Sequence, residues 1–273
     1  DTVITETLIN DLAQQALGAT AEHESPQFET TVVRVELNGY PTAKPLSKSA
    51  HSLAVSVLVS DCDAQIHKGV VETIAKFFPA KTPILRSGVR TALSVLQEIR
   101  PFFVDYVIVD MSSKGSDVVS VINGTAVAHE LVPEGVYSIL ARISGKRLPE
   151  ESLSILRMIA QGQCTDDVCD AMNLAISVSE PDVVKLFGEA LSKLSIKRRL
   201  PNQVFLFTHA DLAPWLTKFF GRIDFAQFTQ TTQPFVVEAP LLATFSKYII
   251  SDASHVMDVG LMTASMLVHM DNY

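Results

Sequence analysis

The 273-residue sequence lacks a basic surface. It carries 22 Lys and Arg against 30 Asp and Glu, a formal charge of −8, and its basic residues are scattered apart from Lys197-Arg198-Arg199. A nucleic-acid-binding domain gathers basic side chains on one face. We therefore expect no nucleic-acid partner.

Long apolar runs are also missing. Stretches such as Leu53 to Val59 are far shorter than the roughly 20 apolar residues of a spanning helix. The composition, 47% apolar and 19% charged, is that of a globular protein large enough for more than one core. We expect a cytoplasmic protein.

Cysteine is scarce, and the usual metal-binding and hydrolase patterns are absent. Cys62, Cys164 and Cys169 form no disulfide framework, and the pair Cys164/Cys169 has no second pair or nearby His for zinc. We expect reduced thiols. The seven histidines show no HxxxH or HExxH pattern, and no serine stands in a GxSxG setting, so neither a metal site nor a serine hydrolase is expected.

Hydrophobic periodicity predicts the elements that are present. A helix capped by Thr5 opens the chain, and two strands follow, of which the more apolar, 52–60, should be the more buried; a wide connection joins them. A helix begins near Asp61 or Asp63 and ends at Pro79. The remaining elements expected as far as residue 144 are a strand at 82–85, a helix at 88–100, three antiparallel strands at 106–110, 118–122 and 125–131 with a tight turn at Asn123-Gly124, and a helix that starts after 133–135.

The C-terminal half is predicted to be helical and then α/β. Three helices are expected in 149–200, with breaks near 162–166 and at Pro181. Strands at 204–207 and 235–238, a helix at 212–220 and a closing helix at 259–268 follow.

The segment from Tyr106 to Leu140 is the most informative for function. A strand ends at Asp110, the turn DMSSKGSD carries small residues, and a second strand returns. This resembles the second phosphate loop of the actin-like ATPase superfamily, of the form DxGxxxTD. Small residues there let backbone N–H groups approach phosphate oxygens, and the acidic side chain holds Mg²⁺ through water.

The order of elements sharpens the resemblance to the FtsA/PilM branch of that superfamily, found in cell division and type IV pilus assembly. That branch inserts a small subdomain before the loop, which residues 29–101 resemble, and its later motif LTGGGALLPGL corresponds to LFTHADLAPWL at 206–216. The resemblance implies an actin-like (ribonuclease H-like) α/β lobe with a small inserted α+β subdomain. Residues 1–28 would end the first actin-like subdomain, 102–148 and 200–273 would form the second lobe, and 149–199 would be a helical subdomain within it.

The resemblance also names nucleotide-contacting residues. These would be Asp110, Ser112, Ser113, Gly115, Ser116, Thr208 and His209, with Asp110 binding Mg²⁺ through water. Alternatively, Asp110 caps the SSKGS turn, and His209 is a turn residue bonded locally.

Two departures from the family pattern weaken the expected ATP site. At Ser112, Ser113 and Lys114 the sequence lacks the glycines typical of the phosphate loop, and Thr208, His209 and Ala210 replace three glycines beneath the adenine and ribose. A Cβ at each position keeps the backbone from a close approach. ATP with Mg²⁺ is therefore not expected to bind tightly. Because the sequence opens on Asp1 and reads like the interior of a protein, the first phosphate loop is expected upstream.

The sequence thus favours an adaptor over an enzyme. The resemblance implies a cytoplasmic scaffold at the inner face of the membrane. It would bind copies of itself or the cytoplasmic tail of a membrane protein, and would touch the membrane only indirectly. The alternative is an active ATPase or small-molecule kinase of the same superfold. No residue is assigned a catalytic role.

Overall fold

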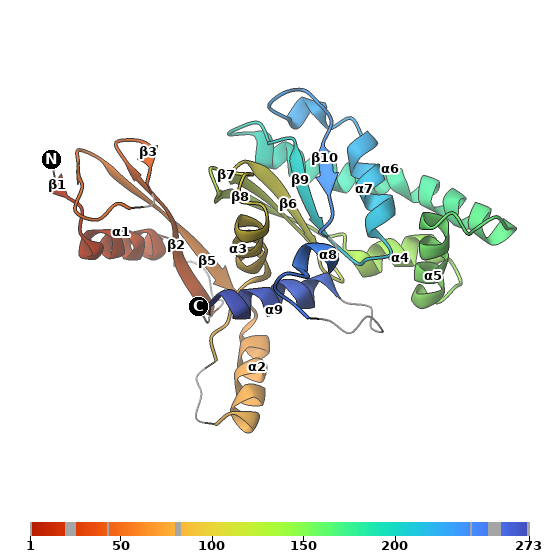
Figure 1. The fold of residues 1–273 in the computed structure, drawn as a ribbon, viewed down its shortest axis with the longest axis horizontal. Coiled ribbons are helices and arrows are strands. Elements are labelled where there is room, and N and C mark those ends of the chain that lie inside the picture. The colour runs from red at the N-terminus through yellow and green to blue at the C-terminus, as the bar shows by residue number, and fades with distance from the viewer. Residues whose placement is uncertain are drawn as a thin grey trace. The chain divides into compact units, whose positions relative to one another are not determined.

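The computed structural model describes residues 2–19, 26–42, 44–79, 83–240, 242–250 and 258–271 (Figure 1). The chain forms two compact units, Asp1–Ser87 and Gly88–Tyr273, and each is described by itself. The helix Gly88–Ile99, which the sequence analysis grouped with the inserted subdomain, lies in the second unit. Its apolar face packs there against the central strand of a five-stranded sheet.

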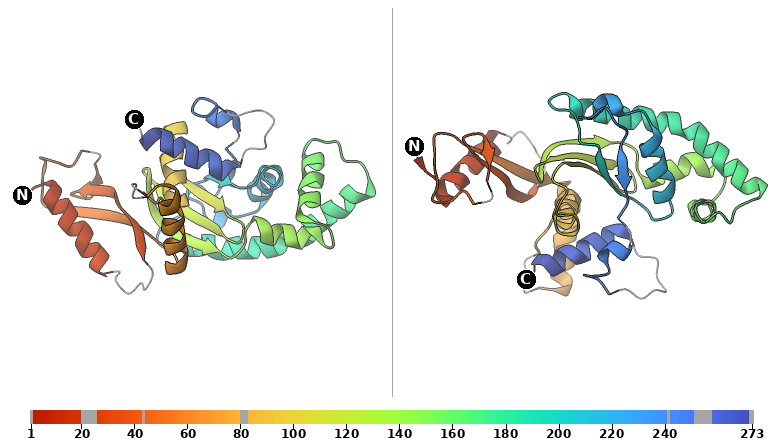
Figure 2. Two further views of the ribbon diagram at one scale, coloured as in Figure 1. Left: turned by 90° about the horizontal axis from the view of Figure 1, so that it is seen from below. Right: turned by 45° about the horizontal axis from the view of Figure 1, so that its top comes forward.

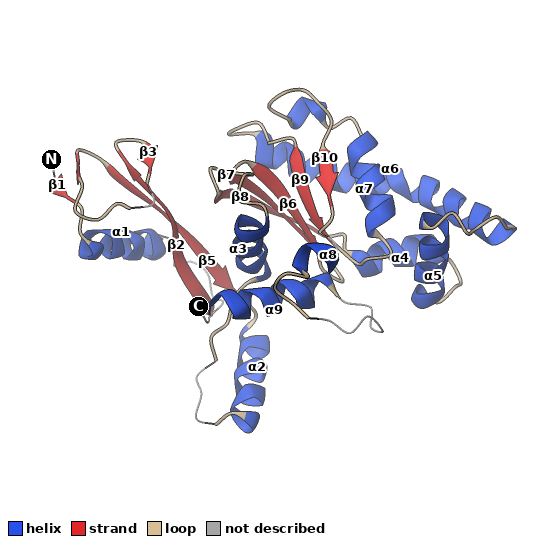
Figure 3. Cartoon of the chain, viewed as in Figure 1, coloured by secondary structure: helices blue, strands red, loops and turns tan. Residues whose placement is uncertain are grey.

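The first unit is a small sheet with one helix against it (Figure 3). Its elements are β1 (Thr2–Val3), α1 (Glu6–Ala19), β2 (Gln27–Leu37), β3 (Tyr40–Pro41), β4 (Ser49–Ala50), β5 (Leu53–Asp61) and α2 (Ala64–Phe77). The antiparallel sheet has the order β3-β2-β5, and β1 pairs with β4. Its core is formed by Ile4, Ile9, Val35, Leu37 and Ala50.

Helix caps in this unit follow the sequence prediction. The Thr5 hydroxyl accepts a hydrogen bond from Leu8 N at 3.2 Å, so Thr5 caps α1. The Asp63 carboxylate accepts bonds from Gln65 N and Ile66 N and caps α2. A side-chain acceptor at this position satisfies N–H groups that have no partner inside the helix.

Two strand predictions in this unit are wrong. β5 has no buried residue, whereas β2 has three, because β5 is an edge strand of a sheet that α1 covers. Residues 83–85 form no strand, and Thr82 lies outside the described residues. The segment is tied to β2 instead: Ser87 N donates to the buried Glu29 carboxylate at 3.0 Å, and Arg86 lies 3.7 Å from it.

The wide connection between β2 and β5 contains a tight turn that the sequence analysis did not predict. Asn38 and Gly39 both have positive φ, 53° and 82°, and β3 pairs back onto β2. Asn and Gly adopt this left-handed conformation at least cost. The Asn38 side chain also accepts bonds from His51 N and Ser52 N, which anchors the return of the chain into β5.

The second unit is a five-stranded mixed sheet with helices on both faces. Its elements are α3 (Gly88–Ile99), β6 (Tyr106–Met111), β7 (Ser116–Ile122), β8 (Thr125–Val132), α4 (Val136–Ser144), α5 (Pro149–Ala160), α6 (Asp167–Ser195), β9 (Gln203–Phe207), α7 (Ala213–Arg222), a 3-10 turn (Ala226–Phe228), β10 (Val236–Glu238), α8 (Leu242–Phe245) and α9 (Val259–Asp271). The strand order is β10-β9-β6-β7-β8. β10, β9 and β6 are parallel, while β7 is antiparallel to both neighbours.

This topology confirms the predicted meander. Asn123 and Gly124 have φ of 51° and 70° and join β7 to β8 in a two-residue turn. The mixed α/β class predicted from the sequence is likewise confirmed.

The central strand β6 divides two cores. Tyr106 and Ile108 pack with Leu93 and Leu96 of α3 on one face of the sheet. Val107 and Val109 belong to the larger core on the other face, where α4, α6 and α7 pack. α9 lies beside α3 in both views of Figure 2 and packs on its outer side through Met262 and Met266.

The predicted break at Pro181 is wrong. α6 runs without interruption from Asp167 to Ser195, so residues 149–200 form two helices instead of three. Proline removes one helical hydrogen bond and costs about 3 kcal/mol in a helix interior. The buried face of α6 continues on both sides of Pro181, from Ile176 to Val183, and its packing outweighs that cost. The break at 162–166 is confirmed.

The reduced state expected for Cys164 and Cys169 is also wrong. The structure joins them in a disulfide with Cα atoms 5.9 Å apart, and Cys62 is free. Asp166 caps α6 by accepting a bond from Cys169 N, and this tight entry into the helix brings the Cα atoms of Cys164 and Cys169 within bridging distance.

Within the described ranges, no helix combines the length and apolar character that crossing a bilayer requires.

Candidate functional site

The candidate site is a pocket at the carboxyl ends of two parallel strands. β6 and β9 end side by side, with Asp110 paired to Phe207, and the start of α9 closes the pocket. Its volume is about 380 Å³. In open α/β sheets, ligands commonly bind where parallel strands end. The residues that line it are Asp110, Met111, Ser112, Ser113, Val136, Phe207, Thr208, His209, Asp258, Val259 and Gly260.

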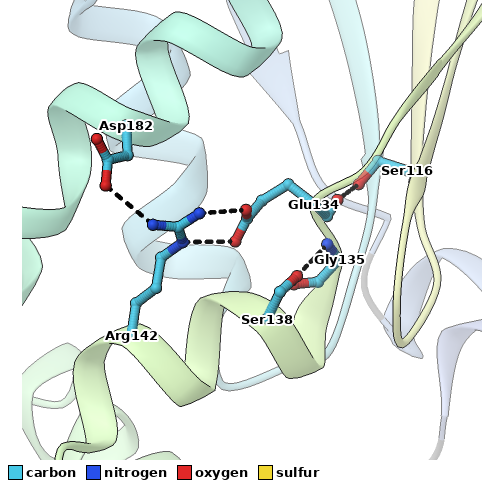
Figure 4. A network of polar contacts seen from close by, with 6 residues as sticks. All are labelled: Ser116, Glu134, Gly135, Ser138, Arg142 and Asp182. Atoms are coloured by element: carbon cyan, nitrogen blue, oxygen red, sulfur yellow. Dashed lines mark hydrogen bonds and ion pairs between the residues drawn. The ribbon is translucent and has the colours of Figure 1, made fainter.

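The structure brings together five of the seven residues proposed from the sequence. Asp110, Ser112, Ser113, Thr208 and His209 line one pocket although about 100 residues separate the two segments. Gly115 and Ser116 do not line it. The Gly115 carbonyl accepts bonds from Ser112 N and Ser112 Oγ, and Ser116 is fully buried with its hydroxyl donating to the Glu134 carbonyl (Figure 4). Both residues stabilise the turn through these hydrogen bonds without lining the pocket.

The turn between β6 and β7 is bonded to two backbone donors at the start of α4. Val136 N donates to the Ser112 carbonyl at 2.9 Å, and Tyr137 N donates to the Ser113 carbonyl at 2.7 Å. These N–H groups belong to the first turn of α4, where a helix usually offers free donors to an anion. In this chain they are bonded to protein carbonyls.

Gly135 permits this close approach. A Cβ built on Gly135 would lie 2.5 Å from Ser112 O and 2.6 Å from Gly115 N, which no side chain allows. The start of α4 therefore touches the turn backbone directly. The Ser138 hydroxyl holds Gly135 from the other side by accepting a bond from Gly135 N at 2.7 Å.

A buried ion pair fixes the segment before α4. Glu134 is 1% exposed, and the Arg142 guanidinium donates to both of its carboxylate oxygens, at 3.1 and 3.0 Å (Figure 4). Arg142 also bonds Asp182 of α6 at 2.9 Å. The hydrogen bond to Glu134 is the main reason that the pKa of Arg142 is raised. The network thus links α6, α4 and the candidate-site turn.

Carboxylates dominate the electrostatics of the pocket. The pKa of Asp110 is raised to about 6, mainly by burial and in smaller part by the nearby charges of Asp117 and Asp258. Among the described lining residues, none is Lys or Arg. The described lining therefore offers a polyphosphate no cationic side chain.

His209 and Thr208 occupy the second side of the pocket. His209 Nδ1 accepts a hydrogen bond from Asp211 N at 3.2 Å. His209 is thus a locally bonded turn residue, which was the alternative given in the sequence analysis. Thr208 is 6% exposed, and its hydroxyl has no hydrogen-bond partner among the residues that the structure describes. Asp211 is itself buried and held by Arg157 of α5. Side-chain contacts therefore hold the turn that is glycine-rich in the resembled family.

The residues of the pocket suit Mg²⁺ and a nucleotide to different degrees. Asp110 and Asp258 supply oxygen atoms of the kind that Mg²⁺ binds through water. A phosphate cradle needs free backbone N–H groups, and the two at the start of α4 are bonded to protein carbonyls. The described lining thus offers oxygen ligands for a hydrated cation, whereas these two N–H groups are not available to a phosphate.

Asp258 is the site residue that the sequence analysis missed. Its carboxylate accepts a bond from Leu261 N at 2.9 Å and caps α9. The signal was available, since an Asp directly before a predicted helix at 259–268 is a typical cap. Its position beside Asp110 depends on how α9 packs against α3, which no local pattern encodes.

Comparison with known proteins identifies the fold. The structure is similar to a solved "PilM-PilN type IV pilus biogenesis complex" chain, with a TM-score of 0.55 and 10% identity over 98% of this chain and 73% of that chain. It is more distantly similar to the ethanolamine utilization protein EutJ from Carboxydothermus hydrogenoformans, with a TM-score of 0.36, 13% identity, and coverage of 84% and 94%. No protein-family model matches the sequence. No curated protein matches it either.

The chain therefore has an actin-like, ribonuclease H-like α/β fold. Within that class, its fold is PilM-like, as the sequence predicted. At 10% identity the likeness defines the fold alone.

Loss of Arg142 should destabilise the second unit strongly. Replacing Arg142 with Met leaves the Glu134 carboxylate buried without its cation, which we expect to cost about 3 kcal/mol. Trp215, the single tryptophan, lies in this unit, so urea unfolding followed by its fluorescence reports the change. Asp182→Asn is the matched control: Asp182 is exposed, and its loss should cost less than about 0.5 kcal/mol. Equal effects of the two variants would contradict the role assigned to Glu134.

Asp110 should make stability depend on pH. The pKa of Asp110 in the folded state, about 6, exceeds its ordinary value of 3.8, so ionisation of this carboxyl group disfavours the folded state. The protein is therefore most stable while Asp110 is protonated, and it loses stability as the pH rises from about 4 through about 6. Asp110→Asn should therefore be more stable than the wild type at pH 8, by on the order of 2 kcal/mol, and no more stable at pH 4. Trp215-monitored urea unfolding at both pH values measures the difference. The exposed Asp11→Asn should change neither value, and a constant Asp110→Asn difference would refute the assignment.

Proposed function

We propose that this chain is an actin-like adaptor of a bacterial membrane-associated machine, for type IV pilus assembly or cell division. It works by protein–protein contact at the inner face of the cytoplasmic membrane, with a degenerate nucleotide site. The similarity to the PilM–PilN chain supports the adaptor role, and one observation supports the degenerate site. The N–H groups of Val136 and Tyr137, at the start of α4, are already bonded to the carbonyls of Ser112 and Ser113.

The charge of the pocket supports the same function. A triphosphate would meet the Asp110 and Asp258 carboxylates and no Lys or Arg among the described lining residues. Side chains at Thr208 and His209 stand where the resembled family has glycines. Each of these differences weakens polyphosphate binding, and neither impairs the fold.

An apolar helix face in the first unit is the proposed partner surface. No residue of α2 is buried, and Ile66, Phe77 and Phe78 are 63, 74 and 62% exposed. Exposed apolar groups in a row mark interaction surfaces. We assign this face to the cytoplasmic tail of a membrane protein, because the similar solved chain comes from a PilM–PilN complex. Lys76, next to Phe77 in the last turn of α2, favours a tail that carries acidic residues.

The alternative is an active ATPase or small-molecule kinase. The observation that favours it is the pair of carboxylates, Asp110 and Asp258, beside the ends of β6 and β9, where Mg²⁺ could be held through water. Micromolar nucleotide affinity would decide for this alternative.

ATP with Mg²⁺ should fail to stabilise the protein. A Kd of 10 μM at 1 mM ATP would add about 2.7 kcal/mol and raise Tm by several degrees. We expect a shift below about 1 °C in thermal unfolding, and no heat of binding in calorimetry. Asp110→Ala serves as the control. Micromolar binding that this variant abolishes would overturn the degenerate-site proposal.

A tail peptide should bind through α2. Labelled peptides matching the cytoplasmic segments of membrane proteins encoded beside this chain can be titrated and followed by fluorescence anisotropy. Phe77→Asp should weaken the peptide that binds by about tenfold, because it places a charge in the apolar contact. Ile196→Asp, an equally exposed site on the second unit, should not.

Sedimentation of the protein without peptide tests whether the α2 face instead binds a second copy of the chain. A dimer that Phe77→Asp disperses would assign the α2 face to a second copy of the chain. Peptide binding that Phe77→Asp leaves unchanged would remove α2 from the contact.

A further inference from the structure

A second pocket lies among α5, α6 and α7, on a part of the second unit that the proposed function does not use. Its volume is about 310 Å³, at the lower end of the range that holds small ligands. Its apolar wall is formed by Leu156, Ile159, Ile176 and Trp215. Leu156 and Ile176 are buried, so this wall continues the core of the unit.

The two acidic groups of this pocket are already neutralised. Glu180 accepts a bond from Trp215 Nε1 at 3.1 Å and forms an ion pair with Arg222. Asp211 is held by the Arg157 guanidinium through two bonds, at 2.8 and 2.7 Å. Both carboxylates are largely buried, with side chains 17% and 8% exposed. They offer little attraction to a cationic ligand.

Lys218 is the charged residue of this pocket that is not paired with another described residue of the chain. It lines the pocket on the exposed side of α7, and in the described part of the chain it has no ion-pair or hydrogen-bond partner. A cation beside an apolar wall complements an anion attached to an apolar body. The ammonium can bind a carboxylate while the body of the ligand contacts Trp215 and Ile176.

We propose that this pocket binds an apolar group that carries a carboxylate. The ligand is an aromatic or branched organic acid, either free or as the carboxyl-terminal residue of a peptide. The bond from Trp215 to Glu180 holds the indole in place before the ligand arrives. A prepared wall of this kind lowers the entropy cost of binding.

Trp215 makes the test direct, because the chain has one tryptophan and it lines this pocket. 3-Phenylpropionate, titrated at pH 7 on the full chain, should change Trp215 fluorescence in a saturable way. The uncharged 3-phenylpropanamide should bind about fivefold more weakly, which is the value of one partly exposed ion pair. Saturation with neither compound, or equal affinity for both, overturns the proposal.

Two lysine variants separate the pocket from general charge effects. Lys218→Met keeps the length of the side chain and should remove the preference for the acid over the amide. Lys185→Met, at an exposed lysine on α6 outside this pocket, should keep it. Both residues are exposed, so neither change should affect folding. A preference that survives Lys218→Met overturns the proposal.

Peptides then distinguish the two possible sources of the carboxylate, a free organic acid and the carboxyl terminus of a peptide. An acetylated tripeptide ending in Phe is compared with the same peptide amidated at its carboxyl terminus. Tighter binding of the free-acid peptide than of 3-phenylpropionate assigns the pocket to a chain terminus, and the reverse order assigns it to a free acid. Nucleotide and α2-tail binding do not enter these measurements, so the outcome is independent of the proposed function.

Discussion

The second unit depends on the burial of β6 on both faces. The apolar residues of this strand each serve one of two cores: Tyr106 and Ile108 face α3, while Val107 and Val109 face the helices on the other side. β7 and β9 satisfy its backbone groups along both edges. A slip by one residue would exchange every side chain between the cores. The strand can therefore end at one place only, and Asp110 and Met111 are fixed there.

The same constraint explains why the pocket keeps its place while its chemistry departs from the resembled family. The ends of β6 and β9 are set by packing, so Asp110 lies beside Phe207 whatever residues follow. The turns beyond the strand ends are free to vary. After β6 the turn is bonded to the start of α4, and after β9 it is bonded through His209 and Asp211. The fold thus fixes where the pocket lies and leaves the residues of its turns free to vary.

Local signals in the sequence predicted most elements of this chain, and they failed where tertiary packing decided. The turn at Asn123-Gly124 was predicted because two clear strands flank it, whereas Asn38-Gly39 has the same chemistry but only the two-residue strand β3 after it. Pro181 was read as a helix break because its local cost is large. The buried face on both sides of it reversed that outcome. No strand forms at 83–85, and the chain just beyond is tied to β2 by the bond from Ser87 N to the Glu29 carboxylate.

The candidate site shows the same division between local and long-range information. Asp110, Ser112 and Ser113 could be found because they lie in one contiguous motif, and Thr208 and His209 because a second motif follows another strand. Asp258 could not, since its place depends on the packing of α9. The role of Glu134 was also hidden, because its partner Arg142 lies two helical turns away and acts only when Glu134 is buried.

The way the two turns are held bears on how the protein works. In some nucleotide-driven switches a segment becomes ordered through its contacts with the phosphate, and the ligand thereby shifts the population of conformations. Here the Ser112–Gly115 turn is held by α4 and by Ser112 itself, and the 208–211 turn by Arg157 through Asp211. Turns that are ordered in advance by the protein's own contacts leave a ligand little differential energy with which to drive a change of state. The proposed scaffold role requires turns of this kind, which hold one arrangement without a ligand.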